Sequence, residues 1–253
     1  NSKTMRSILI LLLFITYISK AQRVTYSLVA LCDNASQGIV PVPASIGDGD
    51  NPKTNLYWGC GYGLKTFFKK SADWKLISTT KVDSIILERL LFFNKTQNVY
   101  HIAEAYRGKE IKQCNINFFK AAAGKINTPI KVNDSLSINT NQATLINYIG
   151  HNGLMDFTLD SYPSRANDVH RKISVLACMA NKYYNKGIKI TNAKPYVWTT
   201  HYMAPEAYTL HAIINSWMKN EDGSKADEAA AQAYNKYQKC GINGARNLFK
   251  TGF

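Results

Sequence analysis

Apolar runs of strand length recur along this chain, and segments with a helical spacing of apolar residues lie between them. The run 26–31 reads Tyr-Ser-Leu-Val-Ala-Leu and stops before a polar, glycine- and proline-containing stretch. Similar runs predict strands at 74–78, 85–93, 98–105, 145–150, 173–177 and 196–200. Polar, turn-rich segments at 37–53, 125–142 and 152–172 are expected to be surface loops.

Four segments have the pattern of helices. Residues 55–70 place Leu56, Gly63 and Phe67 on one face, and residues 108–123 form a second segment that ends before Gly124. Residues 205–217 begin with a proline suited to a first turn, and residues 226–239 are rich in alanine. Because strands alternate with helices, we expect an α/β fold: a single domain over 22–253 with a mostly parallel sheet flanked by helices on both faces.

Two of the predicted strands end on a reactive side chain. The run 145–150 leads into His151, and the run 173–177 leads into Cys178. Neighbouring parallel strands end at the same edge of a sheet, where active sites form. If these strands are adjacent, the imidazole of His151 can activate the thiol of Cys178 as a nucleophile. The plain alternatives are a buried structural thiol and a histidine satisfied within a turn.

Other polar and small residues follow the same strand ends. Gly150 and Gly153 leave room for a substrate backbone, and N–H groups near Gly153 and Cys178 are candidates to bind an oxyanion. Asp156 could orient the imidazole, line the pocket or lie on the surface. Further pocket candidates, each with an ordinary turn role as the alternative, are Asp33, Asn34, Asn152, Thr200 and His201.

The N-terminal segment 5–21 has the pattern of a secretory signal peptide. Arg6 precedes a short apolar run, and Ser19-Lys-Ala21 offers a small-residue cleavage site. We therefore expect an exported protein, periplasmic or secreted, that begins at Gln22 and has no stable membrane insertion after cleavage. An uncleaved N-terminal anchor is the alternative.

The charge distribution and the cysteine spacing argue against several classes of function. The formal net charge of +14 is spread along the chain without a basic stripe interleaved with aromatic residues, so no nucleic-acid partner is expected. There are five cysteines and no Cys-x-x-Cys, which gives no support to a zinc ribbon or a thioredoxin-type pair. We expect neither a metal site nor a cofactor.

The pairs Gly150-His151 and Ala177-Cys178, each at a strand end with the histidine first, resemble the caspase-like cysteine peptidases: caspases, legumains, gingipains, separases and bacterial CHAT domains. The later Val197-Trp198 strand, followed by two helices, resembles CHAT domains in particular. Segments 55–59, 150–156 and 203–208 also resemble an uncharacterised exported bacterial family, which implies no activity.

The caspase-like resemblance implies an exported cysteine hydrolase, with Cys178 attacking a scissile carbonyl and His151 protonating the leaving amine. The expected partner is a peptide or protein substrate, which makes the enzyme an endopeptidase. Two alternatives stay open: a non-catalytic binding or structural module on the same fold, and a small-molecule hydrolase or transferase that uses the same pair.

Overall fold

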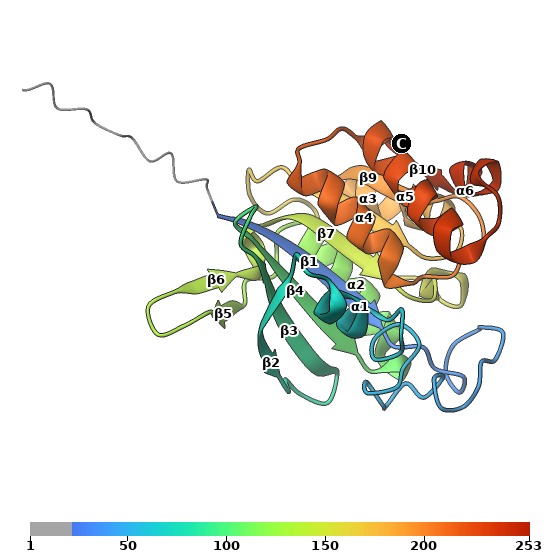
Figure 1. The fold of residues 1–253 in the computed structure, drawn as a ribbon, viewed down its shortest axis with the longest axis horizontal. Coiled ribbons are helices and arrows are strands. Elements are labelled where there is room, and N and C mark those ends of the chain that lie inside the picture. Colours follow the sequence, from blue (N-terminus) through green and yellow to red (C-terminus); the bar gives the residue numbers. More distant parts are fainter. Residues whose placement is uncertain (1–21) are drawn as a thin grey trace, which may run out of the picture.

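In the computed structural model of this protein, residues 22–253 are described, and eight of their strands form one mixed sheet (Figure 1). The predicted signal peptide at 5–21 lies outside the described residues. The strand order is β10-β9-β8-β7-β1-β4-β3-β2. The bounds are β1 (Arg23–Ala30), β2 (Lys75–Thr80), β3 (Ile86–Asn94), β4 (Val99–Tyr106), β7 (Ala143–Ile149), β8 (Lys172–Leu176), β9 (Lys194–Thr199) and β10 (Phe249–Lys250).

The central strands of this sheet are parallel, which confirms the sequence-based expectation of a mostly parallel α/β fold. β4, β1, β7, β8 and β9 pair in parallel, whereas β2, β3 and β10 add antiparallel edges. β7 and β8 are direct neighbours, with Ile149 opposite Leu176 as their last pair. His151 and Cys178 each follow that pair by two residues, so the register brings them to the same edge.

Helices cover both faces of the sheet. In Figure 1, α1 (Leu64–Lys70), α4 (Ala207–Met218), α5 (Gly223–Gln238) and α6 (Ile242–Leu248) lie in front of the sheet, and α2 (Ile111–Ala122) and α3 (Ala180–Thr191) lie behind it. Short 3-10 helices are η1 (Gly108–Glu110), η2 (Thr140–Gln142) and η3 (Gly153–Met155).

Two hydrophobic clusters fill the two interfaces between sheet and helices. Along β1, Tyr26 and Leu28 pack towards α2 and α3, while Val29 packs towards α1, α4 and α5. Successive side chains of a strand point to opposite faces, so one strand contributes to both clusters. This explains why the central strands read as nearly continuous apolar runs.

The helix expected over 55–70 is wrong in its first half, because helix α1 begins only at Leu64. The buried side chain of Asn55 accepts a hydrogen bond from the backbone N–H of Cys32 (3.0 Å) and donates one to the Cys32 carbonyl (2.8 Å). These bonds fix a series of turns before α1. A Cβ on Gly63 would lie 2.5 Å from the backbone of Trp58, so the turns also require a residue without a side chain.

Some elements were not expected from the sequence. Helix α3 was missed because it is polar on most sides; only Ala180, Tyr184, Ile188 and neighbouring small residues are buried. Helix α6 and strand β10 were missed as well. The segment 125–142, expected as a surface excursion, contains a separate hairpin of β5 (Pro129–Lys131) and β6 (Ser137–Asn139), which projects from the sheet at the left of Figure 1.

Of the helices described within 22–253, none combines the length and the apolar character that crossing a bilayer requires.

A buried histidine makes the fold sensitive to acid. His101 on β4 is fully buried among Phe68, Trp74 and Phe92, with Nε2 2.8 Å from the Ser27 hydroxyl. Burial, with a smaller contribution from His211, lowers the pKa of His101 to about 3 from an ordinary value of 6.5. The folded state thus keeps this ring neutral at pH values where the unfolded chain protonates it.

We predict that the buried, neutral His101 makes its full contribution to the free energy of unfolding above pH 6.5. This contribution is lost as the pH falls from 6.5 towards 3, and the loss is on the order of 5 kcal/mol. Urea unfolding at pH 7, 6, 5 and 4 measures it. The double variant Ser27→Ala/His101→Phe fills the same apolar site without a titrating ring, and should have a shallower pH dependence. Equal pH slopes for the two proteins would contradict the prediction.

Candidate active site

Four loops at the carboxyl edge of the sheet enclose one cavity. They follow β1, β7, β8 and β9, and they surround a volume of about 310 Å³. Both His151 and Cys178 line this cavity, together with Gly150. The other lining residues are Gly38, Ile39, Val40, Tyr57, Met155, Tyr202, Met203 and Pro205. The structure therefore brings the two reactive residues together as the strand pattern predicts.

His151 is held through its ring and through its backbone. The imidazole Nε2 lies 2.7 Å from Oδ2 of Asp156, and the backbone carbonyl accepts a hydrogen bond of 2.7 Å from the hydroxyl of Tyr148. An ionised carboxylate only accepts hydrogen bonds, so Nε2 donates in this pair and Nδ1 is the nitrogen left to take up a proton. Of the roles considered for Asp156, the structure shows the orienting one.

The thiol of Cys178 lies in the turn between β8 and α3. Its sulfur is 3.5 Å from the backbone N of Met203, which donates to it. The next residue, Met179, has a positive φ of 51°, and its N–H donates to the carbonyl of His201 (2.9 Å). Cys178 precedes the first turn of α3 by two residues, where the partial positive charge of a helix N-terminus favours an anion.

His151 and Cys178 share the cavity without a direct hydrogen bond between their side chains in the part of the chain that the structure describes. Catalytic hydrogen bonds are often long before substrate binds, so this geometry is compatible with a base and a nucleophile.

Asn152 joins the two loops that carry the pair. Its fully buried side chain donates from Nδ2 to the carbonyl of Cys178 (2.6 Å) and accepts at Oδ1 from the N–H of Leu154 (3.1 Å). The residue is therefore a structural link behind the cavity, and its side chain does not line it.

Gly150 allows β7 to approach the end of β1 closely. Its φ of +146° is rare for other residues, and a Cβ would lie 2.9 Å from the carbonyl oxygen of Ala30. Its N–H donates to the carbonyl of Leu176 (3.2 Å), which extends the pairing of β7 and β8 up to the cavity.

The backbone donors near the cavity differ from the expected set. The N–H of Gly153 donates to the carbonyl of His151 (3.1 Å) as the η3 turn begins, so it is not available to an oxyanion. Within residues 22–253, the N–H groups of Asn152 and Cys178 have no acceptor. Of these two residues only Cys178 lines the cavity, because Asn152 is fully buried.

Asp33 and Asn34, which were pocket candidates, do not line the cavity but order a loop that does. Asp33 accepts from the N–H of Ala35 (3.0 Å) in an Asx turn, and Asn34 bonds to both backbone groups of Val42 (2.7 and 3.0 Å). These bonds order the loop whose residues 38–40 line the cavity.

Thr200 and His201 do not line the cavity either. The Thr200 hydroxyl contacts the carbonyls of Asn247 (2.8 Å) and Leu248 (3.0 Å) and Nδ1 of the exposed His201 (2.7 Å). Both lie at the predicted sheet edge, but the Thr200 hydroxyl is bonded to the end of α6 and the His201 ring is exposed.

Several lining residues were not among the sequence candidates, and Tyr57 is the most buried aromatic among them. Burial, and then the nearby Cys32 and Cys178, hold the pKa of Tyr57 well above its ordinary value. The segments 55–59 and 203–208 that resemble an uncharacterised family contain Tyr57, Met203 and Pro205. That resemblance was the available signal, but it assigned no role to them.

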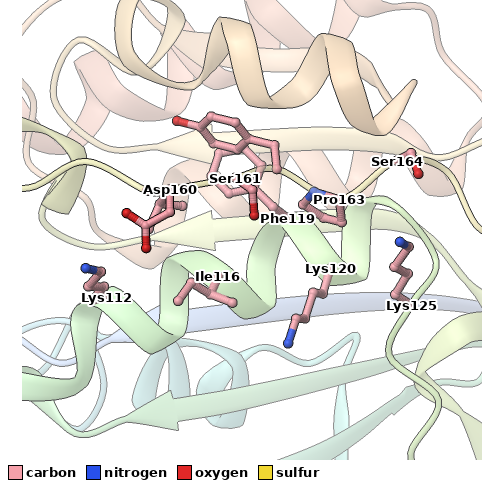
Figure 2. Close-up of a pocket in the computed structure, with 11 residues that line it drawn as sticks. Lys112, Ile116, Phe119, Lys120, Lys125, Asp160, Ser161, Pro163 and Ser164 are labelled. Carbon is pink, nitrogen blue, oxygen red and sulfur yellow. The ribbon is translucent and has the colours of Figure 1, made fainter.

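A second cavity, of about 450 Å³, lies between α2 and the loop 159–164. Figure 2 shows Lys112, Ile116 and Lys120 along α2, facing the loop that carries Asp160 and Ser161. Its lining contains neither histidine nor cysteine, whereas His151 and Cys178 both line the smaller cavity.

The five cysteines, all within the described residues, are free thiols. Burial raises the pKa of Cys32 to about 11, and that of Cys114 well above its ordinary value, which makes both poor nucleophiles. Among residues 22–253, no group of three or more His, Cys, Asp or Glu side chains is placed to hold a metal ion.

Comparisons with protein families, with curated proteins and with solved structures found no match to this chain.

The link made by Asn152 gives a prediction. Asn152→Ala leaves the carbonyl of Cys178 and the N–H of Leu154 without their buried partner, so we expect a loss of about 1–3 kcal/mol of stability in chemical denaturation. The control is Asn243→Ala on the exposed surface of α6, which should change stability by less than about 0.5 kcal/mol. Equal effects of the two substitutions would show that Asn152 contributes nothing special.

Proposed function

We propose that this protein is an exported cysteine endopeptidase with a caspase-like arrangement, in which Cys178 is the nucleophile and His151 the general base. The observation that carries the proposal is the register of β7 and β8. It sets His151 and Cys178 the same number of residues beyond one strand pair, at one cavity, with Asp156 bonded to Nε2 of the imidazole.

The proposed reaction uses these groups in sequence. Cys178 transfers its proton to Nδ1 of His151, and its sulfur attacks the scissile carbonyl carbon. The N–H group of Cys178 then hydrogen-bonds to the oxyanion. His151 protonates the leaving amine as the C–N bond breaks, and water hydrolyses the thioester with His151 again as base. Asp156 keeps Nε2 protonated and stabilises the imidazolium while it carries the extra proton.

The mouth of the cavity favours a peptide over an enclosed small molecule. Val40 and Tyr202 line it, and their side chains are 87% and 71% exposed. A site open on this side has room for residues that flank the scissile bond. The experiments below distinguish the endopeptidase from three alternative functions: a small-molecule hydrolase, a transferase and a non-catalytic binding module.

We predict that Cys178 is alkylated by iodoacetamide at pH 6–7 faster than Cys240, the exposed thiol of the same chain. His151→Ala should slow alkylation of Cys178 at least about tenfold by removing the base, and leave Cys240 unchanged. Asp156→Asn should slow it less, because the imidazole remains. Mass spectrometry of tryptic peptides follows each thiol separately.

If Cys178 reacts only after denaturation, or at the same rate without His151, the hydrolase proposal fails. A non-catalytic binding module is then the favoured function. Rapid alkylation without cleavage of any peptide in a mixed library would favour a small-molecule substrate. Cys178→Ala should abolish turnover and keep the fold.

Export is a separate prediction. If residues 5–21 are a signal peptide, protein recovered from its native host should begin at Gln22. N-terminal sequencing decides this. A chain that retains residues 5–21 inside the cell would contradict export without bearing on the catalytic pair.

A further inference from the structure

The cavity beside Cys178 has an unusual lining for a site that binds peptides of specific sequence. Apart from His151, none of its lining residues carries a titrating acid or base of ordinary pKa near neutrality, and none is Asp, Glu, Lys or Arg. The side chains that form its walls are Ile39, Val40, Tyr57, Met155, Tyr202, Met203 and Pro205. They come from three of the four loops, those after β1, β7 and β9, so the apolar character extends over most of the cavity.

Two carboxylates close to this wall are held by other groups and do not line the cavity. Oδ2 of Asp156 accepts from Nε2 of His151 (2.7 Å) and from the N–H of Gly38 (3.1 Å). Oε2 of Glu206 accepts from the hydroxyl of Tyr208 (2.9 Å) and from Nε2 of Gln238 (3.0 Å). A lysine or arginine side chain of a substrate would therefore find no carboxylate among the lining residues, and an acidic one would find no cation there.

The rim adds exposed apolar surface at the same place. Of the large apolar side chains in residues 22–253, Val40 and Tyr202 are the two most exposed, and both line this cavity. Covering them by an apolar group removes their surface from water, which is favourable. Met155 and Met203 line the cavity too, and their flexible side chains adapt to more than one apolar shape.

We propose that this cavity is a specificity subsite for a large, uncharged apolar side chain, carried by the residue on the acyl side of the scissile bond. The inference rests on the proposed hydrolase function and adds the class of substrate to it. Leucine, methionine and phenylalanine are the expected residues, and aspartate, lysine and arginine are rejected because their charges would lose water without gaining a partner.

The test is a series of peptidyl acyloxymethyl ketones that differ only in the residue next to the ketone: Leu, Phe, Asp, Lys or Arg. In the reaction, the sulfur of Cys178 forms a bond to the methylene carbon, the C–O bond breaks, the carboxylate leaves, and the thiol proton passes to His151. The second-order rate of labelling at Cys178, followed by mass spectrometry, should be at least about 100-fold higher for the Leu and Phe probes than for the charged ones.

A charged rim should change the preference in a defined direction. Val40→Glu puts a carboxylate at the mouth of the cavity at a highly exposed position, so the fold is expected to tolerate it. It should lower the rate with the Leu probe and raise the rate with the Lys probe, each several-fold. Val169→Glu, at an exposed valine that does not line the cavity, is the matched control and should leave the ratio of the two rates unchanged.

The outcomes separate the two proposals. Labelling of Cys178 that is equal for all probes, or fastest with a charged one, overturns the apolar subsite and keeps the hydrolase. Val169→Glu shifting the preference as far as Val40→Glu also overturns the subsite. If no probe labels Cys178 and iodoacetamide does not either, the hydrolase proposal fails, and the substrate class falls with it.

Discussion

The parallel pairing of β7 with β8 is the constraint on which the site depends. Ile149 lies opposite Leu176, and the chain leaves both strands towards the same edge. A shift of one residue would turn every side chain of a strand to the other face, so the apolar faces on both sides of the sheet hold this register. The approach of Gly150 to the Ala30 carbonyl adds a third strand, β1, to the same alignment.

Beyond the ends of the strands, side-chain amides hydrogen-bond to the backbone groups of the loops. Asn55, Asn152 and Gln37 are buried, and each bonds to backbone groups beyond its own turn. Asn55 bonds to Cys32 within the long connection after β1, Asn152 bonds to Cys178 in the next loop, and Gln37 bonds to the carbonyls of Leu31 (2.7 Å) and Gly108 (3.0 Å). A buried backbone group without a partner costs free energy, so these amides substitute for the ladder bonds that irregular loops lack. They hold the walls of the cavity in place without regular secondary structure.

The local sequence pattern predicted the strands and most helices. Strands buried on both faces have long apolar runs, and helices exposed on one side have a periodic apolar stripe. The local pattern failed where tertiary contacts decide. The spacing of Leu56, Gly63 and Phe67 suits a helix, yet the bonds of Asn55 to Cys32 impose turns on the first half of that segment. Helix α3 is the opposite case: its sequence is mostly polar and was not predicted as a helix, yet it forms one and buries Tyr184 and Ile188.

The candidate site also contains residues that the local pattern predicts and residues that only tertiary contacts place. His151 and Cys178 could be found because each ends an apolar strand, whereas the lining residues from the loops after β1 and β9 have no pattern of their own. Thr200 and His201 share the sheet edge, but the hydroxyl of Thr200 is bonded to the end of α6 and the ring of His201 is exposed, which no local pattern shows.

Asp156 connects the base to the wall of the cavity. The same oxygen that accepts from Nε2 of His151 also accepts from the N–H of Gly38, in the loop whose next residues line the cavity. A Cβ on Gly38 would lie 2.5 Å from Oδ1 of Asp156, so the loop comes this close because it has a glycine there. The position of the loop and the orientation of the imidazole are thus fixed by one carboxylate. A displacement of residues 38–40 would therefore change the contact of Gly38 with that carboxylate, which also holds Nε2 of His151.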